Sequence, residues 1–261
     1  MPFLSQNGIK YYQFNSFPSF GVQHGIFTRL GGISPNPWNS LNVGGTVGDD
    51  AERVFENRKR LFHVLNYDLE SVYDVWQIHS ADVVCTDRSR CADEDHIQAD
   101  GILTNSREVT LFMRFADCVP IMLYDPEKKV IGIVHAGWQG TVKKVAAAAV
   151  KKMVSFYGSN SEDIFAGIGP SICADCYEVK SDVITEVQSK LGEIASEVII
   201  QKSGGKTHFD MWQANKLILR NSGVEKIEVA GICTACNHAE WFSHRADHGK
   251  TGRFGAVIRL Q

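Results

Sequence analysis

Short apolar runs crowd the middle of this chain, and they limit its possible folds more than any other feature. Each run is rich in β-branched side chains and is bounded by Gly, Pro or Asp. Runs of this kind are typical of buried β-strands. We therefore predict strands at residues 109–113, 119–124, 130–134, 227–230 and 254–260.

Three other segments have the periodicity or composition of helices. The first begins at Asp50, a residue type that caps helix N-termini, and its predicted buried face holds Val54, Arg58, Leu61 and Leu65. The second runs from about residue 141 to residue 156 through an alanine-rich stretch, and the third covers residues 212–219 after Asp210. Strands and helices together predict a layered α/β (α+β) domain.

Length and charge narrow the class of protein. The 261 residues suit a single domain spanning residues 1–261, because no linker or composition shift divides them. A net charge of −3 offers no field of one sign for a nucleic acid or an anionic membrane. No apolar stretch is long enough to span a membrane, and the N-terminus has no signal-peptide pattern. Seven cysteines, an odd number, favour reduced thiols and a cytoplasmic location.

Three residues suited to metal binding or catalysis lie at the ends of predicted strands: His79, Cys118 and His135. Two imidazoles and one thiolate are a good ligand set for Zn²⁺, and they leave a fourth position for water or substrate. The same residues also permit a cysteine nucleophile, with His135 as its base and Asp117 or His79 orienting that base. The two hypotheses conflict, because a metal-bound thiolate is a poor nucleophile.

Candidate phosphate contacts lie in other segments. The loop through Gly137, Gly140 and Thr141 joins a strand to a helix, and free N–H groups at a helix N-terminus bind anions. The same loop also fits a plain tight turn. Arg29 and Arg245 each offer a guanidinium fork for phosphate or carboxylate, although either also fits a surface turn.

Four of the other cysteines form two Cys-x-x-Cys pairs, Cys173 with Cys176 and Cys233 with Cys236. Four such thiols could build a structural zinc site. A thioredoxin-like redox pair is a further alternative, which requires the motif to open a helix after a strand. We favour reduced, partly buried thiols over both.

Taken together, these segments resemble the YfiH-like family, also called the multicopper polyphenol oxidoreductase or laccase-domain family. The matching motifs occur in the family's order and cover nearly the whole chain. They are Thr28-Arg29-Leu30-Gly31-Gly32-Ile33-Ser34, Leu41-Asn42-Val43-Gly44, Gln77-Ile78-His79-Ser80, Ala99-Asp100-Gly101, Ala116-Asp117-Cys118-Val119-Pro120, His135-Ala136-Gly137-Trp138, Gly169-Pro170-Ser171-Ile172, Cys176-Tyr177-Glu178-Val179, Phe242-Ser243-His244-Arg245 and Thr251-Gly252-Arg253.

The resemblance implies an α/β/β/α sandwich, with two mixed sheets packed together and helices outside. It also implies a cytoplasmic, zinc-dependent purine nucleoside phosphorylase, with His79, Cys118 and His135 as the metal ligands. Such an enzyme cleaves adenosine, inosine and methylthioadenosine with phosphate, giving the free base and ribose 1-phosphate. Adenosine deamination is attributed to the same family. Gln77, beside His79, is expected to contact the substrate or a metal ligand.

Two alternatives and two departures accompany this resemblance. A Cys–His hydrolase or amidase is the runner-up, whereas a copper-dependent polyphenol oxidase is less favoured because multicopper sites need more histidines. Gln139 and Ala246 stand where the family often has a cation, which weakens the predicted hold on phosphate. The expected partners are a purine nucleoside and phosphate, with no nucleic acid or membrane. The sequence leaves the oligomeric state open and is compatible with a monomer.

Overall fold

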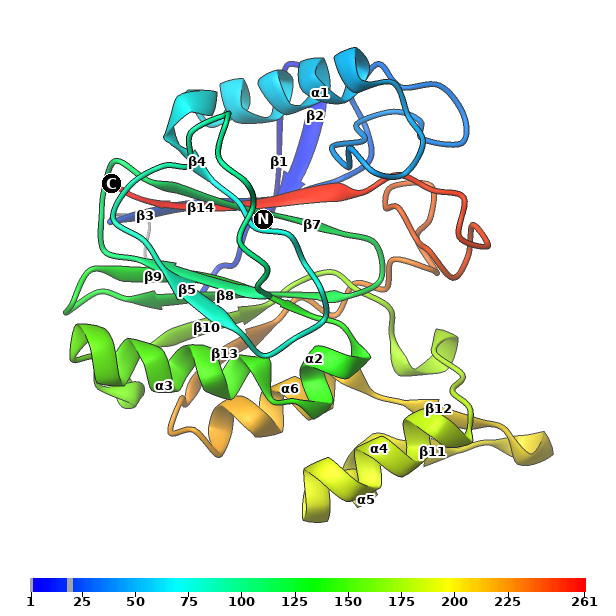
Figure 1. Ribbon diagram of the computed structural model, residues 1–261. Helices are drawn as coiled ribbons and strands as arrows, with labels where there is room; N and C mark the ends of the chain where they lie inside the picture. The colour runs from blue at the N-terminus through cyan, green and yellow to red at the C-terminus, as the bar shows by residue number, and fades with distance from the viewer. Residues whose placement is uncertain (1, 18–20) are drawn as a thin grey trace.

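The computed structural model describes residues 2–17 and 21–261, and two six-stranded mixed sheets form its centre (Figure 1). In the first sheet, only the short outer strand β4 pairs in parallel, with β7; the other neighbouring strands are antiparallel. The strands of this sheet, in spatial order, are β1 (Phe3–Gln6), β2 (Ile9–Tyr12), β3 (Val22–Phe27), β14 (Phe254–Leu260), β7 (Thr110–Phe115) and β4 (Val72–Tyr73).

The second sheet is antiparallel at its centre and parallel at both edges. Its strands, in spatial order, are β13 (Lys226–Val229), β10 (Phe165–Ile168), β8 (Val119–Asp125), β9 (Val130–Ala136), β6 (Gly101–Thr104) and β5 (Val83–Cys85). The strands predicted from apolar runs are β7, β8, β9, β13 and β14, and four of these five lie inside a sheet with a neighbour on either side. A separate antiparallel pair joins β11 (Ile199–Gln201) to β12 (Thr207–Phe209).

Helices cover the outer face of each sheet, which confirms the predicted α/β/β/α sandwich (Figure 1). Helix α1 (Ala51–Val64) lies on the first sheet, whereas α3 (Val145–Tyr157) and α6 (Met211–Arg220) cover the second. Three shorter or more peripheral helices complete the set: α2 (Trp138–Val142), α4 (Ser181–Leu191) and α5 (Ala195–Val198). Single 3₁₀ turns occur at Leu69–Ser71, Ser161–Asp163, Ala174–Cys176, Gly192–Ile194 and Ser203–Gly205.

The space between the two sheets is filled by large apolar side chains. Phe115 and Phe254 of the first sheet lie in one buried cluster with Met122 and Ile133 of the second. Phe115 and Phe254 stack with their ring centroids 5.9 Å apart. Because this layer fixes the two sheets against each other, the strand ends at its rim are held in a defined arrangement.

Helix boundaries follow local chemistry, with one correction. Asp50 caps α1 by accepting hydrogen bonds from the N–H groups of Glu52 and Arg53, and Asp210 caps α6 in the same way through Gln213. The single helix predicted over about residues 141–156 is wrong, because the chain breaks it into α2 and α3. Lys144, at the break, has φ +60°, and a left-handed residue cannot continue a helix.

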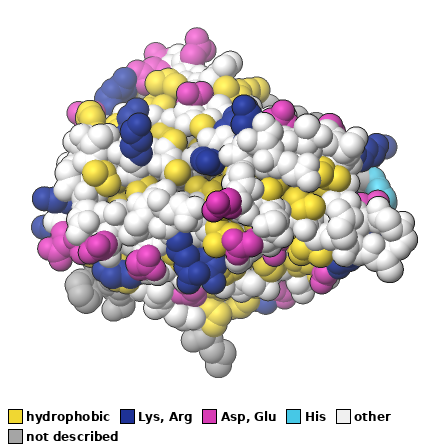
Figure 2. Space-filling view, turned by 90° about the horizontal axis from the view of Figure 1, so that it is seen from below, with side chains coloured by type: hydrophobic (Ala, Val, Ile, Leu, Met, Phe, Trp, Pro, Cys, Tyr) yellow, Lys and Arg dark blue, Asp and Glu magenta, His cyan; other side chains and the backbone are white. Residues whose placement is uncertain are grey.

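On the face seen from below in Figure 1, the charged side chains of the described residues form no patch of a single sign. Figure 2 shows Lys and Arg side chains interspersed with Asp and Glu there, rather than gathered into one field. Among the residues that the structure describes, no helix has both the length and the apolarity needed to cross a membrane.

Candidate metal centre and cavity

The three predicted ligands, His79, Cys118 and His135, meet at one end of the sandwich, and we call them the triplet. His79 lies in the loop after β4, Cys118 directly precedes β8, and His135 is the penultimate residue of β9. The candidate ligand atoms all lie within 4.8 Å of one another, and Cys118 Sγ is 3.9 Å from His79 Nε2. The two imidazole rings are 4.9 Å apart at 74°. Nitrogen and sulfur donors at this spacing suit a zinc ion.

Asp100 is fully buried, and its hydrogen bonds fix the positions of both histidines. Its Oδ1 lies 2.8 Å from Nδ1 of His135, which keeps a proton on Nδ1 and makes Nε2 the nitrogen that can bind a metal once it has lost its own proton. Its Oδ2 accepts hydrogen bonds from the N–H groups of Ile78 (3.1 Å) and Ser80 (2.6 Å), on either side of His79. One carboxylate therefore fixes the ring of one imidazole and the backbone of the other.

The backbone around the triplet adopts conformations that are rare for ordinary residues. His79 has φ +60° and Asp117, beside Cys118, has φ +75°. Gly137 supplies space, since a Cβ there would lie 2.8 Å from a His79 ring carbon and 2.9 Å from Cys118 Sγ. Strained residues at a shared point are typical of functional sites.

The members of the triplet also shift one another's pKa. Burial opposes ionisation of the Cys118 thiol, but the His135 and His79 imidazoles outweigh it and lower its pKa to about 6. Burial likewise opposes the charged form of His135, yet Cys118 and Asp100 raise its pKa to about 9. Thiolate character at neutral pH suits metal ligation and also a cysteine nucleophile.

A cavity of about 690 Å³ opens in front of the triplet. That volume is in the range of small-molecule sites. Its described lining contains four guanidinium groups and a single carboxylate, that of Asp117. The arginines are Arg58, Arg114, Arg245 and Arg253. A cavity with this charge balance favours an anionic ligand.

Two of the other predicted site residues line this cavity. Gln77 is clamped to β7, because its amide donates to Arg114 O (2.8 Å) and accepts from Arg114 N (3.1 Å). The guanidinium of Arg245 lies 5.0 Å from the ring of Tyr177 and donates to Glu178 O (3.1 Å). The Arg245 backbone N–H donates to Asp117 (2.7 Å).

Arg29, a predicted phosphate contact, lies away from the cavity, since it is not among the residues that line it. Its guanidinium is buried and donates to the backbone oxygens of Asn39 (2.7 Å) and His238 (2.8 Å). The face of the group covers the ring of Phe242 at 4.5 Å. The donors that we expected to meet phosphate instead tie two loops together.

The residues of the predicted anion loop lie in two different surroundings. Gly137 lies against the triplet, but Gly140 and Thr141 are buried inside α2 rather than along the cavity. The Thr141 N–H donates to Gly137 O (2.8 Å), and its hydroxyl accepts from Asn215 (2.9 Å). This part of the chain is a tight strand-to-helix turn in which the Thr141 N–H already has a partner.

Sequence reasoning assigned no role to three of the arginines in the cavity, Arg58, Arg114 and Arg253. For Arg58 the sequence does contain one indication of a role, because this charged residue lies on the otherwise apolar face of the first predicted helix. In the structure, Arg58 donates twice to Val43 O (3.0 and 2.9 Å) at the cavity wall. Burial and the neighbouring Arg114 lower its pKa to about 10, so it stays charged at neutral pH.

Known proteins place the chain in a family. A family model described as multi-copper polyphenol oxidoreductase laccase matches residues 23–261, and the chain belongs to this family. Purine nucleoside phosphorylase YlmD of Bacillus subtilis (strain 168) is 40% identical over 245 residues, covering 91% of this chain and 88% of that protein. Adenosine deaminase RL5, from an unknown prokaryotic organism, is 34% identical, covering 92% and 94%. The crystal structure of YlmD from Geobacillus stearothermophilus is 34% identical, with a TM-score of 0.92 and coverage of 100% and 99%.

Proposed function

We propose that this chain is a purine nucleoside phosphorylase that cleaves adenosine, inosine and methylthioadenosine. The observation that carries the proposal is a single cavity with a nitrogen and sulfur ligand set at its base and four arginines around it. Similarity to proteins named purine nucleoside phosphorylase supports the same activity. In this reaction a phosphate oxygen bonds to C1′ of the ribose, and the C1′–N9 bond breaks with its electron pair leaving on the purine.

The arginines are proposed to hold phosphate. Arg114 is itself held by Asp74 (2.5 Å), and Arg253 by Gly252 O (2.9 Å), so both groups are oriented before a ligand arrives. Nη1 of Arg58 has no hydrogen-bond partner among the described residues and is available to an anion. Gly44 and Gly45 also line the cavity, and a Cβ at Gly44 would lie 2.7 Å from the Arg253 side chain, so glycine there lets Arg253 keep its position. Arg245 is proposed to contact the ligand from the opposite loop, and Gln77 from the base of the cavity.

The triplet is proposed to hold zinc as the cofactor. Asp100 already sets the tautomer of His135, and Gly137 leaves the space in front of Cys118 open. When bound, a zinc ion would supply a fixed positive charge that polarises an oxygen. Copper is the alternative metal. The thiolate and two imidazoles suit zinc as well as copper, but they do not match the ligand set of a multicopper site. The apolar part of the wall is proposed to cover the purine, through Trp76, Trp138, Ile172, Tyr177 and Met211.

Two further activities have an observation in their favour. Deamination of adenosine is supported by similarity to the protein named adenosine deaminase RL5. A Cys–His hydrolase is supported by the low pKa of Cys118 and by Asp100 behind His135. We further propose that residues 1–261 form one domain acting in the cytoplasm, since its seven thiols are all free.

One assay separates these activities. Adenosine or inosine is incubated with inorganic phosphate, and the base, inosine and ribose 1-phosphate are quantified for wild type, Cys118→Ala and the exposed-cysteine control Cys91→Ala. We expect base and ribose 1-phosphate in equal amounts from wild type and Cys91→Ala, with a loss of more than about 100-fold in Cys118→Ala. Zinc-loaded wild type that releases no base from either nucleoside would refute phosphorolysis. Release of base with free ribose in place of ribose 1-phosphate, without added phosphate and after metal removal, would support the hydrolase instead.

A further inference from the structure

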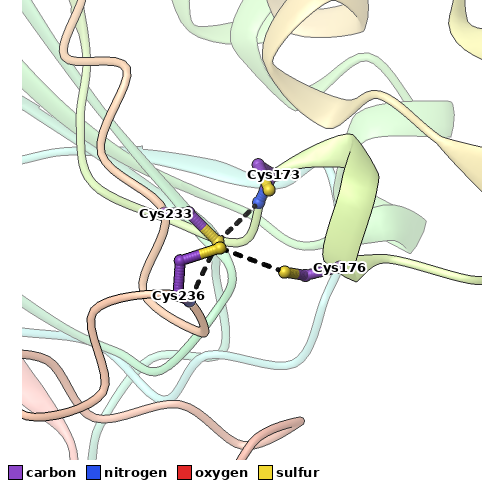
Figure 3. A group of neighbouring side chains, drawn as sticks. All are labelled: Cys173, Cys176, Cys233 and Cys236. Atoms are coloured by element: carbon purple, nitrogen blue, oxygen red, sulfur yellow. Dashed lines mark hydrogen bonds between the residues drawn. The ribbon is translucent and has the colours of Figure 1, made fainter.

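A second group of potential ligands lies outside the triplet, and we call it the cysteine cluster: Cys173, Cys176, Cys233 and Cys236. Two of these residues lie in the loop after β10, and the other two lie in the loop after β13. Figure 3 shows the four side chains directed toward one shared space. All four sulfur atoms lie within 4.8 Å of one another, and all four thiols are free.

The distances suit a closed tetrahedral site. Zinc–sulfur bonds of about 2.3 Å in tetrahedral geometry separate the sulfurs by about 3.8 Å. The observed separations are close to that value, since Cys176 and Cys236 are 3.3 Å apart and no pair exceeds 4.8 Å. Small side-chain rotations are therefore sufficient to surround one ion. Two Cys-x-x-Cys pairs on separate loops are a common pattern of structural zinc sites.

The surroundings of the cluster favour a charged sulfur. The N–H groups of Cys173 (3.3 Å) and Cys236 (3.4 Å) both donate to Sγ of Cys233, which is buried. Hydrogen bonds from backbone N–H groups stabilise an anionic acceptor. Cys236 is exposed, so an ion can enter from solvent. The cationic group of Arg245 lies beside the cluster, 3.4 Å from Cys176 O.

The two loops that carry the cluster also build the cavity wall. Tyr177 follows Cys176 and lines the cavity, and Arg245 lines it from the other loop. Thr234, between the two cysteines of the second pair, donates to Asp117 Oδ1 (2.7 Å) next to Cys118. The loops meet at a parallel bridge between Ser171 and Cys233. Whatever joins the four sulfurs therefore also fixes the position of this wall.

We propose that the cysteine cluster binds one zinc ion as a structural site that holds these two loops together beside the cavity. The four thiols lose their protons to solvent when the ion binds, and no electron is transferred. The ion has no open position, because four sulfurs complete its coordination. It takes no part in nucleoside chemistry, and its effect on activity acts through the positions of Tyr177 and Arg245.

The zinc content of purified variants tests this site without any assay of activity. Protein is produced in zinc-supplemented medium under reducing conditions, and zinc per chain is measured by mass spectrometry for wild type, Cys236→Ser, Cys118→Ala and the control Cys91→Ser. We expect Cys236→Ser to hold one zinc fewer than wild type and to melt at least about 5 °C lower. Cys91→Ser should match wild type. Cys118→Ala should keep the ion that Cys236→Ser loses.

Cobalt substitution identifies the ligands of the lost ion. The cobalt-loaded protein should show strong sulfur-to-metal charge-transfer bands that remain in Cys118→Ala and weaken in Cys236→Ser. Equal zinc in Cys236→Ser and wild type would overturn the proposal, and so would a Cys176–Cys236 disulfide in a non-reduced digest. Because Cys236 is exposed, its substitution should leave a folded protein. Failure of the phosphorolysis assay would not change any of these results.

Discussion

The triplet and the cysteine cluster differ in ligand type and in what lies in front of them. The triplet combines two imidazoles with one thiol, and it faces a cavity of about 690 Å³ lined by four arginines. The cluster consists of four thiols enclosed between two loops. Three donors leave a position for a substrate atom, whereas four sulfurs leave none. The triplet is therefore suited to an ion that takes part in a reaction, whereas the cysteine cluster is suited to an ion that only holds two loops together.

The largest expected effect comes from a substitution that disturbs the triplet and leaves the cysteine cluster intact. In Gly137→Ala the new methyl carbon would lie 2.9 Å from Cys118 Sγ and 2.8 Å from the His79 ring, so the triplet must move. Misplacement of catalytic groups by about 1 Å can cost on the order of 100-fold, and we expect phosphorolysis to fall by at least that factor. Zinc per chain should fall by one. Steady-state rates and zinc content measure both effects.

Gly140→Ala is the matched control for that substitution. It adds the same methyl group one helical turn away, where the nearest atoms, the backbone oxygen of His135 and a methyl of Val145, are 3.3 Å from the new carbon and neither is a candidate ligand atom. We expect its rate to stay within about threefold of wild type. Equal loss of rate in both variants would mean that helix α2, rather than the triplet, had been disturbed.

The next effect concerns the support behind the triplet. Asp100→Asn keeps the shape of the side chain but removes the charge that orients His135. Partners of metal ligands typically contribute about 10- to 100-fold to metal affinity, and we expect a loss in that range for the triplet alone. Competition with a chromophoric chelator should release one zinc early and the other at its wild-type affinity. Asp82→Asn, an exposed change of equal charge, should release neither early.

Protonation of one buried histidine gives a smaller effect, a loss of folding stability in acid. This loss must be measured before the metal content of the triplet and the cysteine cluster is compared at different pH values. His24 is buried, and its Nε2 accepts the N–H of Phe14 (2.8 Å), so the ring must be neutral. Burial lowers its pKa to about 4, although Glu228 opposes the shift. The resulting stability is present above the unfolded pKa of about 6.5 and is lost as the pH falls toward 4.

Denaturant unfolding at two pH values measures this loss. Between pH 7.5 and pH 5 the wild type should lose about 2 kcal/mol more than His24→Gln, whose amide cannot be charged. Acid release of metal affects both proteins alike and cancels in the difference. Parallel stability curves for the two proteins would show that His24 titrates normally.

Much of the fold could be predicted because the central strands are buried on both faces. Strands β7, β8 and β9 are continuous apolar runs for that reason. Strand β1 lies at the edge and is mostly exposed, and β2 beside it has only four residues, so neither forms an apolar run long enough to be recognised in the sequence. The break at Lys144 also escaped prediction, since an alanine-rich sequence favours one helix and no local pattern marks a left-handed φ at a lysine.

The site was predictable where residue type alone decides the chemistry. Histidine and cysteine are good zinc ligands in any fold, so the triplet stood out from the sequence. A guanidinium group binds phosphate only where the fold leaves its donors free, and this separates Arg29 from Arg58. Arg29 is tied to Asn39 and His238, whereas Arg58 reaches the cavity from the buried side of α1. Tertiary position, which no local pattern encodes, decides between them.

The smallest expected effect measures how strongly the two regions are coupled. The Thr234 hydroxyl is buried and donates to Asp117 Oδ1 (2.7 Å), so it joins the cysteine loop to the residue before Cys118. Thr234→Val should cost about 1 kcal/mol of unfolding free energy and a few-fold in phosphorolysis. Thr251→Val removes a hydroxyl-to-carboxylate bond of the same length from a buried threonine, to the partly exposed Asp247 (2.7 Å), and is the matched control. It should cost the same stability with less effect on rate.

A double-mutant cycle then decides whether that bond transmits the influence of the cluster. If it does, adding Thr234→Val to Cys236→Ser should cost less rate than Thr234→Val alone, because the loop has already been released. Adding Thr251→Val to Cys236→Ser should instead give the sum of the two single effects. Strict additivity in both cycles would mean that the cluster fastens its loops without reaching the triplet through Asp117, leaving Tyr177 and Arg245 as the contacts through which it acts.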